Sequence, residues 1–71
     1  MNKEEFMIQM LRNKDTRETI AKVLKISKTT LSRKLNETGS EFTRTEITTL
    51  KEYWNLTTTE VDNIFFNLVV S

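Results

Sequence analysis

The amino-acid sequence predicts a single all-α domain of five helices that spans residues 1–71. Its apolar residues recur at the three- and four-residue spacing of helices, whereas strands would show an alternating pattern. Short polar residues that favour helix N-termini precede the apolar stretches, and the chain has no proline and one glycine to interrupt helices. With 71 residues, nearly all of the apolar side chains must share one core.

Four of the helix starts are indicated by a capping residue that is followed, three residues later, by glutamate. The pairs are Asn2 with Glu5, Asp15 with Glu18, Thr43 with Glu46, and Thr57 with Glu60. In such a capping box the first side chain accepts a hydrogen bond from a backbone N–H group that the first helical turn leaves unpaired. Apolar staple pairs flank three of the boxes, namely Met1 with Phe6, Phe42 with Ile47, and Leu56 with Val61.

Each expected helix carries apolar residues on one face. These are Phe6, Met7, Met10 and Leu11 in the first helix, Ile20, Ala21 and Leu24 in the second, and Leu31 and Leu35 in the third, which Ser27 caps. The fourth has Ile47, Leu50, Tyr53 and Trp54, and the fifth has Val61, Ile64, Phe65 and Leu68. The joints are expected near residues 13–15, 25–27, 37–42 and 55–57.

The composition argues against catalysis and metal binding. Because the chain has no cysteine and no histidine, it lacks disulfides, thiolate nucleophiles and the usual zinc ligands. We therefore predict that the protein is not an enzyme and has no cofactor, metal or small-molecule substrate. No apolar run approaches the length of a membrane span, and the first residues do not form a secretory signal. These features predict a cytoplasmic protein without a membrane partner.

The net charge of +1 hides two halves of opposite charge. Residues 1–36 carry nine Lys or Arg against four Asp or Glu, a net +5, whereas residues 37–71 carry two against six, a net −4. This asymmetry suggests that the two halves face different partners, although solvated helix faces can also differ in charge by chance. The density of cations favours the functional interpretation, since Glu18 is the single acid among Arg17, Lys22, Lys25, Lys28, Arg33 and Lys34.

The second and third helices form a predicted helix-turn-helix. Ala21 is small where the helices approach each other, and a tight turn near residues 25–27 separates them. In this motif the second helix enters the major groove of DNA. At 100° per residue, a cationic and hydrogen-bonding face without acids occupies roughly 140° of arc on the third helix. Such a face suits base edges and phosphates as well as solvent, and its place in the motif favours double-stranded DNA. It consists of Lys28, Thr29, Ser32, Arg33 and Asn36.

The chain also resembles the lambda-repressor-like (Cro/repressor) helix-turn-helix regulators of bacteria and temperate phages. The residues that carry this resemblance are Ile20-Ala21, Leu24, Ile26-Ser27, Thr30-Leu31-Ser32-Arg33 and Leu35-Asn36, with the downstream segments Glu41-Phe42-Thr43 and Trp54-Asn55-Leu56-Thr57. The resemblance implies a five-helix lambda-repressor-like DNA-binding domain in a bacterial host cell. Within that group, the chain is most similar to small Cro-type regulators and modulators of repression, which act opposite a repressor in a lysis–lysogeny switch.

The resemblance also implies roles for individual residues. Lys28, Thr29, Ser32 and Arg33 would read bases or position the helix, Ser27 would open it, and Arg17, Asn36 and Thr38 would meet phosphates. The family usually has glycine in the turn, where this chain has Lys25. A lysine with a positive φ would cost about 1 kcal/mol there.

A second expected surface lies on the fifth helix, whose other flank carries Phe66, Val69 and Val70. A helix on a protein surface needs one apolar stripe, so a second stripe predicts a contact with another protein chain. Self-association would form a homodimer that reads two DNA half-sites, and binding to a cognate repressor would make the protein an antirepressor with weak or no DNA binding alone. The sequence leaves these alternatives open, with operator DNA binding as the leading hypothesis.

Overall fold

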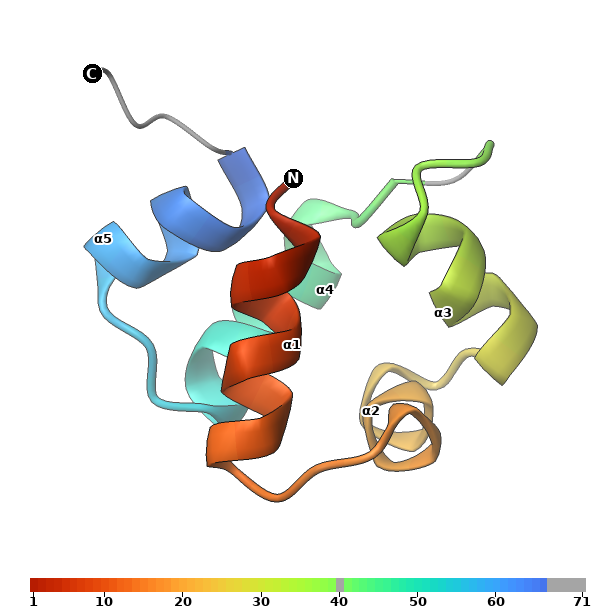
Figure 1. The fold of residues 1–71 in the computed structure, drawn as a ribbon, viewed down its shortest axis with the longest axis horizontal. Coiled ribbons are helices and arrows are strands. Elements are labelled where there is room, and N and C mark those ends of the chain that lie inside the picture. Colours follow the sequence, from red (N-terminus) through yellow and green to blue (C-terminus); the bar gives the residue numbers. More distant parts are fainter. Residues whose placement is uncertain (40, 67–71) are drawn as a thin grey trace.

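Five α-helices follow one another in the computed structural model, which describes residues 1–39 and 41–66 (Figure 1). Within these residues there is no strand, so the predicted all-α fold class is confirmed. The helices are α1 (Lys3–Arg12), α2 (Arg17–Leu24), α3 (Lys28–Leu35), α4 (Arg44–Tyr53) and α5 (Thr58–Val61), and a π-helical turn, η1 (Asp62–Phe66), continues α5.

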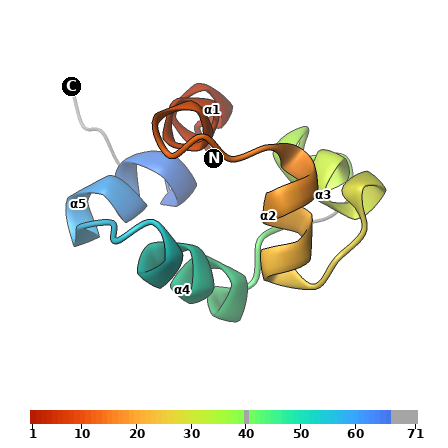
Figure 2. The same ribbon diagram turned by 90° about the horizontal axis from the view of Figure 1, so that it is seen from below.

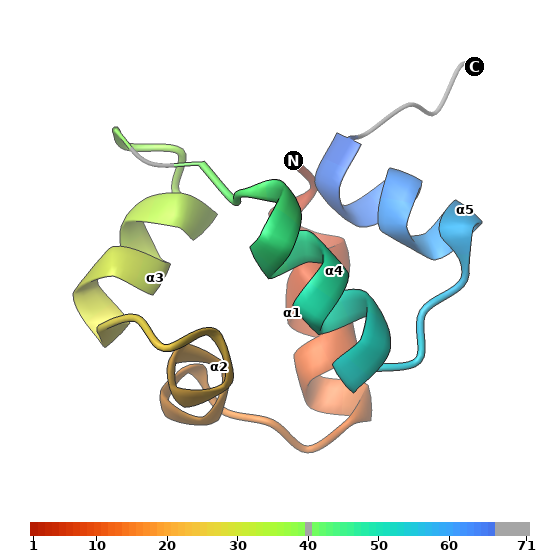
Figure 3. The same cartoon turned by 180° about the vertical axis from the view of Figure 1, so that it is seen from behind.

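The helices surround one apolar core. Seen from below, α1 and α4 lie on opposite sides of it, with α5 at one end and the α2–α3 pair at the other (Figure 2). In the view from behind, α4 lies nearest the viewer, between α3 and α5 (Figure 3). In this arrangement α2 and α3 form one corner of the fold, where they pack against each other and α2 also contacts α4.

Most of the predicted helix starts are confirmed. The side chains of Asn2, Ser27, Thr43 and Thr57 each accept a hydrogen bond from the backbone N–H three residues later. At Thr43 and Thr57 the glutamate also returns the hydrogen bond, which completes both capping boxes.

The predicted cap of α2 at Asp15 is wrong, because Thr16 occupies that position. Thr16 has the extended backbone of an N-cap, and its Oγ1 accepts from the N–H of Thr19 at 3.2 Å. The Asp15 carboxylate instead accepts hydrogen bonds from Trp54 Nε1 at 2.8 Å and from the Tyr53 hydroxyl at 2.9 Å. The hydrogen bond to this carboxylate raises the pKa of Tyr53 above its ordinary value. Asp15 thus gives the indole of a buried tryptophan its partner and ties the α1–α2 joint to the end of α4.

The core contains most of the apolar residues that the helical spacing placed there, and three of them are exceptions. Met7, Leu11 and Tyr53 are exposed to 37%, 81% and 45%, because the buried stripe of α1 runs through Phe6 and Met10 and that of α4 through Leu50. Leu68, which was expected on the fifth helix, lies outside the described residues. The buried core is Phe6, Met10, Ile20, Ala21, Leu24, Leu31, Leu35, Leu50, Trp54, Leu56, Val61, Ile64 and Phe65.

Helices α1 to α4 all end in the same left-handed turn, and none of them uses glycine for it. Lys14, Lys25, Glu37 and Asn55 have φ between 54° and 59°. In each turn the next N–H bonds back to the carbonyl five residues earlier, as in Ile26 N–H to Ala21 O at 2.9 Å. This Schellman geometry satisfies carbonyl groups that the helix ends leave unpaired.

Replacing Lys25 by glycine should stabilise the fold. The left-handed conformation costs a residue with a Cβ roughly 1–2 kcal/mol, and glycine removes this cost. Part of the resulting gain in stability is lost, because glycine has a greater conformational entropy in the unfolded chain. We expect Lys25→Gly to raise the free energy of unfolding by about 0.5–1 kcal/mol in urea denaturation. The matched control is Lys22→Gly, inside α2, which should lower it by about 1 kcal/mol. A Lys25→Gly variant as unstable as the control would contradict the strain.

Candidate nucleic-acid interface

The turn between α2 and α3 is built from three local interactions. Lys25 adopts the left-handed conformation (φ 59°, ψ 42°) that reverses the chain after α2. Ser27 then caps α3, because its Oγ accepts from the N–H of Thr30 at 3.0 Å. Ala21 is 3% exposed at the contact between the helices, where a larger side chain would push them apart. The predicted helix-turn-helix is therefore present, with α3 as its second helix.

Helix α3 turns one face to the core and the other to solvent. Leu31, Lys34 and Leu35 are buried. Among the predicted DNA-contacting residues, one is half-buried, Ser32, and seven are exposed, namely Arg17, Ser27, Lys28, Thr29, Arg33, Asn36 and Thr38. The outer face of α3 thus presents the basic and hydroxyl side chains together, as the helical spacing predicted.

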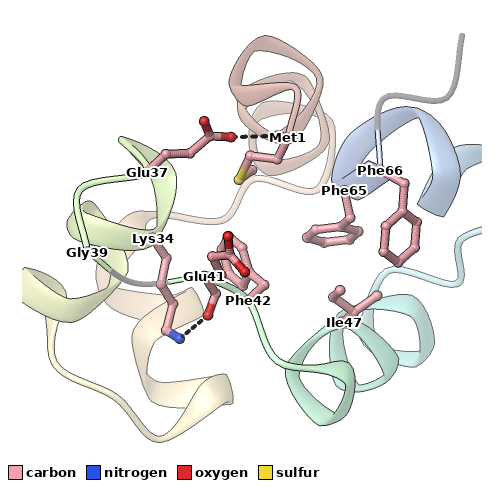
Figure 4. Close-up of a pocket in the computed structure, with 9 residues that line it drawn as sticks. All are labelled: Met1, Lys34, Glu37, Gly39, Glu41, Phe42, Ile47, Phe65 and Phe66. Carbon is pink, nitrogen blue, oxygen red and sulfur yellow. Dashed lines mark hydrogen bonds and ion pairs between the residues drawn. The ribbon is translucent and has the colours of Figure 1, made fainter.

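Lys34 does not belong to the exposed basic surface, although it lies in the cationic stretch of the sequence. Its side chain is 8% exposed, and its Nζ lies 2.9 Å from Glu46 Oε1. The same Nζ donates to the carbonyl oxygen of Glu41 at 2.8 Å, a contact shown in Figure 4. The ammonium also lies over the ring of Phe42, at 5.8 Å from its centroid. Lys34 therefore neutralises a charge inside the protein and leaves the DNA-facing surface one cation poorer.

The carboxylate of Glu46 joins α3 to α4 through this ion pair. Its Oε1 accepts from the backbone N–H of Thr43 at 2.9 Å, which completes the capping box of α4, and it also pairs with Lys34. Burial raises the pKa of Glu46, but the Thr43 N–H and the Lys34 ammonium outweigh this effect, so the pKa lies below its ordinary value of 4.5. The orientation of α3 is therefore coupled to the start of α4 by a charged group.

Helix α1 contributes a cation near α3 that no local sequence pattern predicts. Lys3 Nζ donates to Asn36 Oδ1 at 2.7 Å, and the amino group of Met1 pairs with Glu37. Both contacts join residues more than thirty positions apart, at the end of α3. Local sequence patterns carry no signal for such contacts, since they depend on how α1 packs in the folded chain. Lys3 thus extends the basic surface beyond the helix-turn-helix.

The predicted partner surface is present in part. Phe66 is 51% exposed and stands at the rim of an open hollow of about 620 Å³, between the start of α1, the α3–α4 joint, α4 and η1 (Figure 4). Phe42, Ile47 and Phe65 line its apolar side, and Lys34, Glu37 and Glu41 line its polar side. Val69 and Val70, the other members of this predicted surface, lie outside the described residues.

Two further features concern the described residues alone. No three acidic side chains within residues 1–39 and 41–66 gather closely enough to hold a metal ion. No helix in this part of the chain is both long and apolar enough to cross a membrane.

Comparison with known proteins places this corner of the fold in a family. A family model described as the helix-turn-helix domain of resolvase matches residues 1–38, which comprise α1, α2 and α3. This match supports a helix-turn-helix DNA-binding family and is not specific to the Cro/repressor group. No curated protein and no solved structure matches the chain.

Removing the charge of Glu46 should destabilise the fold in a pH-dependent way. Glu46→Gln keeps an acceptor for the Thr43 N–H but leaves the buried Lys34 without its counter-ion, so we expect a loss of about 2–3 kcal/mol at neutral pH. Because the pKa of Glu46 is lowered in the folded protein, its carboxylate contributes fully to stability above pH 4.5, the ordinary pKa. This contribution to stability is lost as the pH falls through the folded pKa.

The measurement is urea denaturation of both proteins from neutral pH down to about pH 3. The difference between them should shrink toward the acidic end, as the wild-type carboxyl itself becomes protonated. Glu52→Gln, an exposed change in the same helix, is the control and should have no comparable effect. A difference that stays constant over this pH range would contradict the role of the ion pair.

Proposed function

Because the chain belongs to the family of resolvase-type helix-turn-helix domains, we propose that it binds double-stranded DNA with α3 in the major groove. The observation that carries this proposal is the outer face of α3, where basic and hydroxyl groups are exposed and no acidic residue occurs from Lys28 to Asn36. We propose a binding role without catalysis.

The exposed cations divide into two groups by position. Lys28 and Arg33 lie on α3 itself, where a side chain can reach base edges, and Arg33 is the best candidate to read guanine. Arg17, at the start of α2, and Lys3, beside the end of α3, flank this helix and suit contacts with phosphates on either side. Phosphate contacts would supply most of the affinity and α3 most of the specificity.

The biological role that we propose is the regulation of transcription at an operator. The resemblance to small Cro-type regulators supports a more specific form of this proposal, in which the protein acts in the lysis–lysogeny switch of a temperate phage. In vitro selection from a pool of random DNA duplexes would test the first step, because an operator-binding protein enriches one sequence motif and a non-specific binder enriches none.

A second candidate function is that of an antirepressor, which binds a cognate repressor protein. The exposed Phe66 beside a hollow with one apolar side favours this candidate, since an exposed aromatic residue next to a concave surface is a common anchor for protein contacts. A pull-down of the cognate repressor by this chain, with and without operator DNA, separates the two candidate functions. An antirepressor retains the repressor without DNA and loses it on Phe66→Glu, whereas a DNA-binding regulator retains it only through DNA.

The affinity for DNA should fall steeply with salt. Each phosphate that the protein neutralises adds about −0.9 to the slope of log K against log salt concentration. Arg17→Ala and Lys3→Ala should each reduce the slope by about that amount, as measured by fluorescence anisotropy with a labelled duplex. Lys51→Ala, an exposed change in α4, is the control and should leave the slope unchanged. An affinity that does not depend on salt would rule out the electrostatic mechanism.

Arg33→Ala should weaken binding to the selected duplex by about 1–3 kcal/mol and relax the preference at one base pair. The reason is that a bidentate contact to guanine is lost while the fold, in which Arg33 is exposed, is unchanged. Binding to duplexes with each base pair substituted in turn measures both effects. If Arg33→Ala weakens binding to all duplexes equally, Arg33 contacts phosphate and another residue reads the base.

A further inference from the structure

Helix α1 carries an apolar surface on the side that faces away from the core. Met7, Ile8 and Leu11 are 37%, 43% and 81% exposed, and we refer to these three residues as the α1 patch. At 100° per residue Ile8 lies opposite the buried stripe of Phe6 and Met10, and Met7 and Leu11 lie on the flank between that stripe and Ile8. The core therefore does not account for them, although two of the three follow the helical spacing of core residues.

No other helix of the described residues covers this face. Figure 2 shows α1 at one edge of the molecule, with α4 on the opposite side of the core and α2 and α5 beside it. Three large apolar side chains within five residues form one contiguous area, since residues three and four apart are neighbours on a helix. A contiguous exposed apolar area in a chain this small is typical of an interaction surface.

The charges around the α1 patch indicate what covers it. Glu4 and Glu5 lie in the first turn of α1, and Arg12 lies in the last turn. Neither Glu4 nor Arg12 takes part in an ion pair among residues 1–39 and 41–66. An antiparallel copy of the same helix would set acidic first turns against basic last turns at both ends, whereas a parallel copy would set like charges together.

We propose that the occupant of this surface is a second copy of the chain, with the two α1 helices packed antiparallel across a two-fold axis. In such an interface each contact occurs twice, because the same surface serves both subunits. Ile8 would lie at the centre, Leu11 would pack on either side of it, and Glu4 would face Arg12 of the partner subunit at each end. This dimer does not depend on DNA binding and would join two helix-turn-helix units in one particle.

Sedimentation equilibrium of the full chain without DNA tests the proposal, over a concentration range from micromolar to millimolar. The wild-type protein should show a monomer–dimer equilibrium, and Leu11→Glu should weaken it by more than about 100-fold, because two charges would enter the apolar centre. Thr48→Glu, which places the same charge on an exposed residue of α4, is the control and should leave the equilibrium unchanged. Phe66→Glu tests the other exposed apolar surface. A wild-type monomer throughout, or a dimer that only Phe66→Glu disrupts, would overturn the proposal.

A charge exchange tests the antiparallel orientation separately. Glu4→Lys and Arg12→Glu should each weaken self-association by about tenfold, because each creates like-charge contacts at both ends. An equimolar mixture of the two variants should recover the dimer, since the heterodimer pairs opposite charges again. Thermal unfolding by circular dichroism confirms that each variant is folded. The antiparallel arrangement would be overturned if the single variants dimerised as strongly as the wild type, or if their mixture failed to recover the dimer.

Discussion

The aromatic cluster around Phe6 is the contact on which the rest of the structure depends. Phe6 is fully buried, and its ring lies 5.2 Å from that of Trp54, 5.5 Å from that of Phe42 and 6.1 Å from that of Phe65, measured between centroids. These residues belong to α1, the end of α4, the joint before α4, and η1. A chain of this length has one core, and this cluster joins four of its segments in edge-to-face and stacked contacts.

Helix α3 is attached to the rest of the fold by two kinds of contact, apolar and ionic. Leu31 and Leu35 enter the core, while Lys34 reaches Glu46 and the Glu41 carbonyl oxygen. Apolar burial is not directional, but a buried ion pair with its hydrogen bonds satisfied specifies one geometry. Glu46 caps α4 and holds Lys34 with the same oxygen, so the helix start and the orientation of α3 are parts of one network.

The outer face of α3 and the α1 patch differ in chemistry and lie on different helices of the region that matches the helix-turn-helix family. The outer face of α3 is basic and hydrogen-bonding, which suits a polyanion, whereas the α1 patch is apolar with opposite charges at its ends, which suits a second protein chain. Because the two surfaces lie on different helices, the two proposed partners, DNA and a second copy of the chain, would not compete for the same residues.

Local patterns were sufficient to predict the five helices, the caps at Ser27, Thr43 and Thr57, and the helix-turn-helix, because capping and periodicity act within a few residues. Local patterns were insufficient where two neighbouring residues could each cap a helix, or where a side chain contacts a residue far away in the sequence. Asp15 has the spacing of a cap, but the indole of Trp54, thirty-nine residues away, takes its carboxylate. Lys34 belongs to the cationic stretch of the sequence, but it is buried with Glu46 and the Glu41 carbonyl oxygen, and Leu11 has the spacing of a core residue but is exposed on α1. The sequence by itself thus determined which segments are helical, and the tertiary structure decided which charged and apolar side chains remain at the surface, because burial depends on contacts between segments.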